Sequence, residues 1–205
     1  MNGGRAELLP GTWSATLEWL VRRLAPRFPR VAFVEVRYRV RSWKRLELCV
    51  EDAREAIAAA GDVPIAMLAF SMGGAVATMV AADSRVRAVV GVAPWLPDQL
   101  DVAPLRGRRL TVVHGSLDRN LPALPGVSAE LSRRGFDRAL AAGADGDYHL
   151  VRGGLHAVAI RGGGRLVALP RARAYEHHVA QALDAFAPDA APAAPPKTAS
   201  AYPPT

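Results

Sequence analysis

The chain has 205 residues, half of them hydrophobic and 22% charged, which predicts a single globular domain with its own core. Cys49 is the only cysteine, which excludes an intrachain disulfide, and we interpret it as a small buried hydrophobe on a helix. The formal net charge is +7, but the arginines are scattered and do not interleave with aromatic residues. This distribution argues against a nucleic-acid-binding surface.

The apolar residues do not form a long continuous run. Because no stretch of about 18 apolar residues occurs, we expect no membrane span. The first residues, MNGGRAELLP, lack the apolar stretch of a secretory signal, which predicts a cytoplasmic location. At the other end, Ala and Pro dominate without an amphipathic pattern. We therefore expect a domain over residues 1–187 and a disordered tail over residues 188–205.

The hydrophobic pattern predicts an alternation of strands and helices. An amphipathic helix with Ser14 as its cap is indicated by the apolar spacing in SATLEWLVRRLA. A strand is indicated by the alternation of side chains in VAFVEVRYRV. A strand covered on both faces is indicated by the continuous apolar run PIAMLAF. In chain order, the expected elements are a short strand at 6–10, a helix at 14–25, a strand at 31–40, a helix at 47–60, a strand at 64–70, a helix at 72–82, strands at 86–93 and 109–114, a helix at 127–142, a strand at 147–151 and a helix at 171–186.

This order defines the expected fold class, which is α/β. Strands that alternate with helices pair most readily as a mostly parallel sheet, joined by right-handed crossovers. The helices then cover both faces of the sheet. The sequence therefore predicts a three-layer α/β/α sandwich.

Ser71 stands between the buried strand that ends at Phe70 and the helix that follows it, in the segment AFSMGG. A tight strand-turn-helix connection exposes a serine hydroxyl and directs the next backbone N–H at a reacting oxygen. Small residues such as Gly73 and Gly74 leave room for the turn. The alternative interpretation is a helix N-cap serine followed by flexible glycines.

An acid and a base follow Ser71 in later loops. Asp118 comes after the strand at 109–114, in HGSLD, and His156 comes after the strand at 147–151, in GGLHA. Because the carboxyl ends of parallel strands share one edge of the sheet, we expect Ser71, Asp118 and His156 to meet there. The order Ser, Asp, His strengthens a prediction that each residue alone would carry only weakly.

Together these segments make the chain resemble the α/β-hydrolase superfamily, in its small single-domain branch, dienelactone-hydrolase-like or prolyl-oligopeptidase-like. AFSMGG resembles the nucleophile elbow of that family, HGSLD its acid loop and GGLHA its histidine loop. The resemblance extends from Gly11 to about Ala187 and implies a minimal fold without a lid. It also implies Ser71 as the nucleophile, His156 as general base and then acid, and Asp118 as the group that orients the imidazole.

The resemblance further implies two backbone donors for an oxyanion, the N–H groups of Met72 and Thr12. Thr12 belongs to Pro10-Gly11-Thr12, where the family usually has His in place of Pro10, and Ala69 stands where its elbow usually has Gly. Only ten residues precede Gly11, whereas most members have two or three strands there. We therefore expect either an unusually small sheet or a natural chain that begins earlier.

Other residues compete for some of these roles. Asp98 and Asp101, which follow the strand at 86–93, are alternatives to Asp118 as the acid. Trp95, beside the same strand, is expected either as a wall of the substrate pocket or as a packing residue.

The remaining histidines are expected outside the reacting centre. His149 lies inside a predicted strand, and His177 and His178 fall on the last helix, where we expect them to be solvated. His114 is interpreted as a brace for the loop that carries Asp118.

These patterns favour a serine hydrolase that cleaves an ester, thioester or amide of a small soluble substrate through an acyl-enzyme. An acyltransferase on the same scaffold, or a binding protein that has lost catalysis, remains an alternative. No CxxC, HExxH, GxGxxG or Walker loop is present, so we expect neither a metal site nor a cofactor. The oligomeric state is left open.

Overall fold

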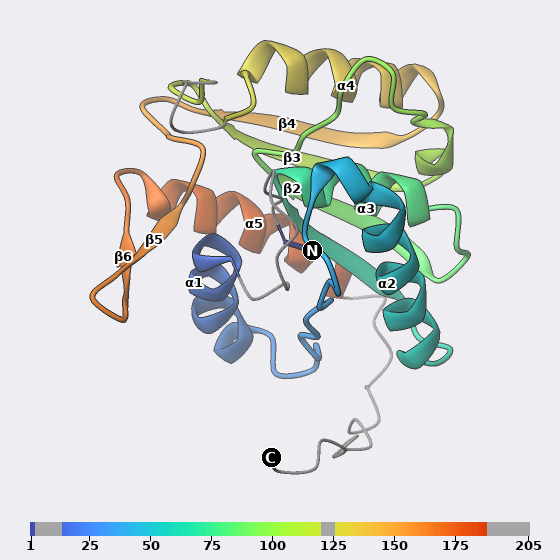
Figure 1. Cartoon of the computed structure of the whole chain (residues 1–205), viewed down its shortest axis with the longest axis horizontal. Coiled ribbons are helices and arrows are strands. Elements are labelled where there is room, and N and C mark those ends of the chain that lie inside the picture. Colours follow the sequence, from blue (N-terminus) through green and yellow to red (C-terminus); the bar gives the residue numbers. More distant parts are fainter. Residues whose placement is uncertain (3–13, 120–125, 188–205) are drawn as a thin grey trace.

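The computed structural model describes residues 1–2, 14–119 and 126–187 (Figure 1). Its central sheet contains four parallel strands in the order β1-β2-β3-β4, and two further strands form an antiparallel hairpin. The strands are β1 (Ile65–Phe70), β2 (Val86–Val92), β3 (Arg109–Gly115), β4 (Asp145–Val151), β5 (Ala159–Gly162) and β6 (Arg165–Ala168).

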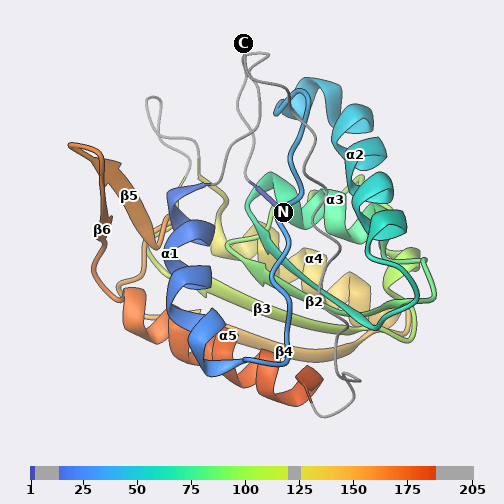
Figure 2. The ribbon, with the colours of Figure 1, turned by 90° about the horizontal axis from the view of Figure 1, so that it is seen from below.

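Helices cover both faces of this sheet. They are α1 (Ala15–Leu24), α2 (Leu46–Ala59), α3 (Met72–Val80), α4 (Ala129–Ala141) and α5 (Ala172–Phe186). Figure 2 shows α2, α3 and α4 on one side and α1 and α5 on the other. The predicted α/β fold with a parallel sheet between helical layers is therefore confirmed.

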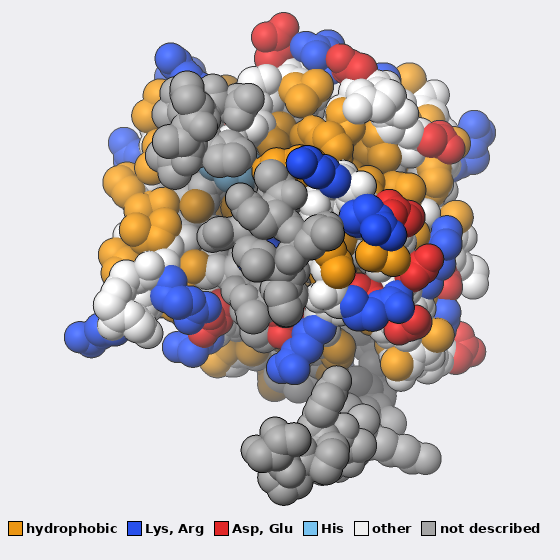
Figure 3. Space-filling model, viewed as in Figure 1, with side chains coloured by type: hydrophobic (Ala, Val, Ile, Leu, Met, Phe, Trp, Pro, Cys, Tyr) orange, Lys and Arg blue, Asp and Glu red, His pale blue; other side chains and the backbone are white. Residues whose placement is uncertain are grey.

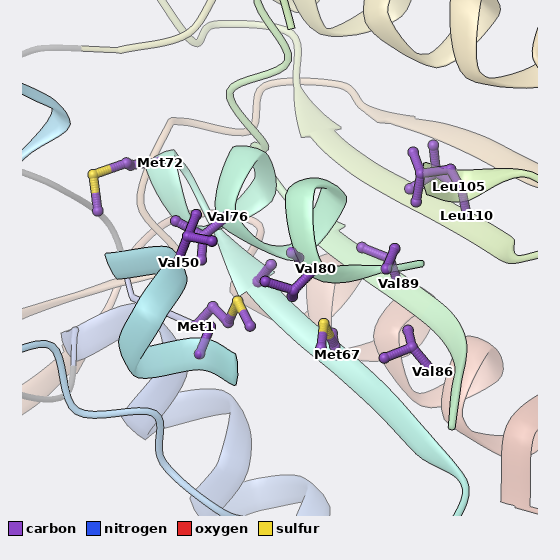
Figure 4. Close-up of a cluster of buried hydrophobic side chains, with 14 of the residues drawn as sticks. Met1, Val50, Met67, Met72, Val76, Val80, Val86, Val89, Leu105 and Leu110 are labelled. Carbon is purple, nitrogen blue, oxygen red and sulfur yellow. The ribbon is translucent and has the colours of Figure 1, made fainter. Parts of the chain in front are cut away.

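Two clusters of buried hydrophobic side chains hold these layers together. One cluster joins the sheet to α2, α3 and α4, and Figure 4 shows Val50, Met67 and Val76 within it. The other joins the opposite face to α1 and α5. Along β1, Met67 and Ala69 pack into the first cluster, while Leu68 and Phe70 pack against the second. The apolar run of β1 is thus explained by helices on both of its faces.

Serine caps fix the beginnings of two helices. The hydroxyl of Ser14 accepts a hydrogen bond from the N–H of Leu17 at the start of α1. Ser128 does the same for Leu131 at the start of α4, over 3.1 Å. Such caps satisfy backbone donors that have no partner within the helix.

Eleven helices and strands were predicted. Apart from the strands expected at 6–10 and 31–40, the other nine agree with the structure within two residues at either end.

The prediction of a strand at residues 31–40 is wrong. The segment is not a strand, although its side chains alternate as expected: Val31 and Phe33 pack against one core cluster, and Val36 and Tyr38 join the other. A strand needs a neighbour that pairs with its backbone, and no described strand pairs with this segment. The alternation therefore reflects how the side chains pack, without a ladder of hydrogen bonds.

The hairpin of β5 and β6 was not predicted. Its two-residue turn is Gly163-Gly164, with φ of 54° and 76°, and both values lie in the left-handed region that glycine adopts easily. The expected strand at 6–10, Thr12 and the expected tail at 188–205 lie outside the described residues.

Basic and acidic side chains are interspersed on the face seen in Figure 3. Ion pairs join such groups in the described residues, as Arg39 with Asp52 and Arg134 with Asp98. Across these same residues, none of the helices combines the length and the apolar character that a membrane crossing requires.

Candidate active site

Ser71 occupies a sharp turn between β1 and α3. Its φ of 54° and ψ of −120° lie outside the regions that non-glycine residues normally adopt. A conformation of this kind costs about 1–3 kcal/mol and persists only where surrounding contacts hold it. Here the Ser71 N–H donates to the carbonyl oxygen of Val92 over 3.2 Å, and the Ser71 carbonyl accepts from the N–H of Trp95 over 2.8 Å. The end of β2 thus fixes the turn.

Two glycines after Ser71 allow the turn to pack closely. A Cβ atom on Gly73 would lie 2.5 Å from the carbonyl oxygen of Met1, and one on Gly74 would lie 2.5 Å from the Cβ of Pro94. Both separations are far below a van der Waals contact. The glycines of FSMGG are therefore required by the crowding of α3 against neighbouring backbone.

The structure brings the hydroxyl of Ser71, the imidazole of His156 and the carboxylate of Asp118 into one chain of hydrogen bonds. His156 Nε2 lies 3.0 Å from Ser71 Oγ, and His156 Nδ1 lies 2.7 Å from Asp118 Oδ2. The side chain of Asp118 is fully buried, whereas that of His156 is 21% exposed. An imidazole placed in this way can accept the serine proton at Nε2 while it donates from Nδ1 to the carboxylate.

Hydrogen bonds between two loops set this geometry. The backbone N–H groups of Ser116 and Leu117 donate to the carbonyl oxygens of Val151 and Gly154, over 3.0 and 2.9 Å. In return, the N–H of Gly153 donates to the hydroxyl of Ser116 over 2.9 Å. The loop after β3 and the loop after β4 are therefore joined directly, which places the acid next to the base.

The environment of Asp118 favours its ionised form. Burial alone raises the pKa of a carboxyl group, but hydrogen bonds from His114 and His156, together with their charge, outweigh it and hold the pKa of Asp118 below its ordinary value. The backbone N–H of Val127 also donates to Asp118 Oδ1 over 3.0 Å. The carboxylate can therefore accept the Nδ1 proton of His156.

An aromatic side chain that the sequence reasoning did not single out lies against the base. The ring centroids of Phe70 and His156 are 5.0 Å apart, at an interplanar angle of 43°. Phe70 directly precedes Ser71, and this adjacency was the available signal. The Phe70 ring therefore lies against one side of the imidazole.

The alternative acids make other contacts. Asp98 is exposed and pairs with Arg134 and Arg138 of α4, over 3.0 and 3.2 Å. Asp101 accepts a hydrogen bond from the backbone N–H of Ala103. The acid that His156 contacts is Asp118, and it is neither Asp98 nor Asp101.

The other histidines also lie in separate contacts, apart from His114, which touches Asp118. His149 stacks on His178 at a centroid distance of 4.2 Å, and His177 meets the same ring edge-on. Partial burial, together with the neighbouring His149, holds the pKa of His178 below its ordinary value.

Three remaining residues were predicted around the reacting centre. Met72 is the first residue of α3, and no described residue accepts a hydrogen bond from its backbone N–H. Thr12 lies outside the described residues. Trp95 is partly buried and packs against the core cluster beneath α3. Within the described ranges, no group of three or more His, Cys, Asp or Glu side chains could hold a metal ion.

Comparison with known proteins concerns the fold of the chain. A family model described as the alpha/beta hydrolase fold matches residues 37–132, just under half of the chain. A comparison with curated protein sequences gives no match.

Solved structures resemble the chain at low identity. A protein from Xanthomonas campestris pv. campestris that is assigned to the α/β hydrolase superfamily has 18% identity and a TM-score of 0.57, over 89% of this chain and 95% of its own. Est1E from Butyrivibrio proteoclasticus, solved with ferulic acid bound, has 14% identity and a TM-score of 0.51, over 68% of each chain.

An α/β serine hydrolase homologue from Coxiella burnetii has 15% identity and a TM-score of 0.49 over 69% of this chain. The match spans only 60% of the length of that protein.

The sheet order, the strained serine turn and the family model point to the same architecture. This chain has the α/β-hydrolase fold.

Proposed function

We propose that this protein is a serine hydrolase that cleaves an ester, a thioester or an amide through an acyl-enzyme formed on Ser71. The observation that carries the proposal is the continuous hydrogen-bonded path from Ser71 Oγ through His156 to Asp118, with distances of 3.0 and 2.7 Å. A serine on a strained turn, next to a base that a buried carboxylate orients, has the arrangement that activates a hydroxyl nucleophile.

In the first half of the reaction, Ser71 Oγ attacks the substrate carbonyl carbon as His156 Nε2 takes its proton. Asp118 stays ionised and stabilises the imidazolium through the Nδ1–H bond. The backbone N–H of Met72, at the start of α3, is the proposed donor to the oxyanion, and Thr12 is the proposed second donor. His156 then protonates the leaving group, and the carbon–leaving-group bond breaks.

In the second half, water replaces the leaving group. His156 Nε2 takes a proton from water as the water oxygen attacks the acyl carbon, and the bond between that carbon and Ser71 Oγ breaks. The proton returns to Ser71 Oγ, and a carboxylic acid is released. Because the same imidazole serves as base and acid in both halves, its position relative to Ser71 governs both rates.

The chain around the site supports small substrates. Between β2 and β3 it forms only one 3-10 turn, at Ala103–Leu105, which leaves no room for a lid domain in that connection. A site without a lid domain in this connection suits a short soluble acyl group better than a long lipid chain. We therefore propose a small-molecule acyl substrate.

Initial rates of hydrolysis of p-nitrophenyl acetate, butyrate and octanoate test the proposal. We expect the wild-type protein to turn over the short esters and the Ser71→Ala variant to fall to the background rate. Ser128→Ala, which removes a serine hydroxyl at the cap of α4, is the matched control and should keep the activity. Equal rates for wild type and Ser71→Ala would contradict the proposal, and an inactive wild type would favour a binding protein on this fold.

A further inference from the structure

His114, at the end of β3, is a fully buried histidine that the proposed reaction does not use. Its Nε2 atom lies 3.0 Å from Asp118 Oδ2 and 2.9 Å from the carbonyl oxygen of Val127. Its ring also stacks on Tyr148, with centroids 6.5 Å apart and an interplanar angle of 10°. A second imidazole therefore contacts the same carboxylate oxygen as His156.

The surroundings of the His114 ring select one tautomer. Two oxygen atoms face Nε2, and a lone pair there would repel both of them. Nδ1 is buried and has no hydrogen-bond partner among the described residues, so a proton at that position would lose water without a replacement. The tautomer that carries its proton on Nε2 satisfies these contacts, because that N–H can be shared between the carbonyl oxygen of Val127 and Asp118 Oδ2.

The carboxylate of Asp118 is consequently held from several sides. Oδ1 accepts a hydrogen bond from the N–H of Val127 over 3.0 Å, and Oδ2 accepts one from His156 Nδ1 over 2.7 Å. His114 Nε2 lies 3.0 Å from the same Oδ2 atom. Gly126 packs so closely that a Cβ atom there would lie 2.5 Å from Oδ1. The contact with His114 Nε2 opposes rotation of the carboxylate about its side-chain bond.

We propose that His114 is a positioning residue, which fixes Asp118 Oδ2 where His156 Nδ1 requires it. The effect of His114 on the reaction rate rests on the proposed hydrolase function. The effect of His114 on the position of the Asp118 carboxylate does not. If the donor is lost, Asp118 can turn, and His156 then no longer points at Ser71 Oγ. Small displacements of reacting groups cost on the order of 100-fold in rate.

Other titratable groups surround the carboxylate and stay constant in the test. The hydroxyls of Tyr148 on β4 and Tyr175 on α5 face this region, and burial, together with the negative charge of Asp118, raises the pKa of both. Neither hydroxyl titrates in the acidic range where Asp118 does. A change in the titration of Asp118 can therefore be assigned to the altered His114 and to the contact between Asp118 and His156 that depends on it.

Four variants distinguish the effect of losing the N–H donor of His114 from the effect of changing the size of its side chain. His114→Phe keeps a planar ring without a donor, His114→Gln offers an amide N–H near the place of Nε2, and His114→Asn has an amide that is too short to reach it. His149→Phe, on the neighbouring strand, is the control. The two measurements are the pKa of the Asp118 carboxyl, by 13C NMR titration, and the rate at which a fluorophosphonate labels Ser71.

We expect His114→Phe and His114→Asn to raise the pKa of Asp118 and to slow labelling by about 10- to 100-fold. His114→Gln and His149→Phe should stay close to wild type in both measurements. If the phenylalanine variant does not fold, the comparison of Gln with Asn decides the question alone.

An unchanged pKa of Asp118 in His114→Phe and His114→Asn would overturn the proposal. So would a His114→Gln variant that is as impaired as His114→Asn. A wild-type protein that is not labelled at Ser71 would instead refute the hydrolase function, and the titration of Asp118 would still decide whether His114 positions the carboxylate.

Discussion

The hydroxyl of Tyr175 donates a hydrogen bond to the carbonyl oxygen of Leu155, directly before His156 in the chain, over 2.6 Å. Tyr175 is completely buried in α5, and a Cβ atom on Gly115 or Gly154 would lie within 2.3 or 2.7 Å of its hydroxyl oxygen. The last helix thus holds the loop that presents the proposed base.

Tyr175→Phe is expected to weaken both stability and catalysis. A buried carbonyl loses its partner, which costs about 1–2 kcal/mol in the free energy of unfolding and lowers Tm by roughly 2–8 °C. The looser loop should also lower kcat for ester hydrolysis. Tyr148→Phe is the matched control, because the Tyr148 hydroxyl donates to the carbonyl oxygen of Ala129. It should lower Tm similarly and leave kcat unchanged, and equal kcat values for the two variants would contradict this role.

Gly74→Ala tests the crowding at the serine turn. The added methyl group would lie 2.5 Å from the Cβ of Pro94, so α3 or the turn must shift. We expect a loss of about 1–3 kcal/mol in the free energy of unfolding and a large fall in kcat, because Ser71 moves relative to His156.

Gly162→Ala in β5 is the control for that variant, since its methyl group would come no closer than 4.0 Å to a neighbour, at Val167. Urea unfolding and ester hydrolysis measure both effects. If Gly74→Ala folded stably and kept full kcat, the close packing of the turn would be unnecessary.

Asp118→Asn is expected to keep the fold and to lower kcat by up to about 10⁴-fold. An amide cannot stabilise the imidazolium and favours the wrong tautomer of His156. Asp98→Asn is the matched change on the surface, and it should keep kcat. If Asp98→Asn abolished activity while Asp118→Asn kept it, the assignment of the acid would be wrong.

Asp118→Asn is also expected to change how the free energy of unfolding depends on pH. The pKa of Asp118 is lowered in the folded protein, so its contribution to stability is present above the unfolded value of about 3.9 and is lost as pH falls through the folded value. Wild type should therefore exceed Asp118→Asn in the free energy of unfolding at neutral pH, and the difference should shrink below about pH 4. Urea titrations from pH 7 to pH 3 measure it. A difference that grows on acidification would contradict the lowered pKa.

The sequence predicts the fold from local patterns. The same patterns predict that Ser71, Asp118 and His156 lie close together. PIAMLAF has the apolar run of a strand buried on both faces, and parallel strands bring the loops at their carboxyl ends to one edge. Each of the three residues follows such a strand, so topology alone brings them close.

What the sequence did not predict depends on partners far along the chain. Residues 31–40 have the alternation of a strand, but pairing is a property of two segments, and the pattern of one cannot supply it. Gly163-Gly164 between two short runs was a detectable hairpin signal, although four-residue strands leave little pattern. The sequence suggested that His114 braces the loop of Asp118, but which atoms of that loop it contacts depends on a rotamer, which no spacing encodes.

Covalent labelling with a fluorophosphonate is the most direct test of Ser71 as an activated nucleophile, because the reagent reacts with such a serine and needs no knowledge of the substrate. Folded wild-type protein is incubated with the reagent, and peptide mass spectrometry locates the adduct. We expect one adduct, on Ser71, with none on Ser71→Ala, strong slowing in His156→Ala and unchanged labelling of Ser128→Ala. An adduct on another residue, or folded wild-type protein without any adduct, would contradict it.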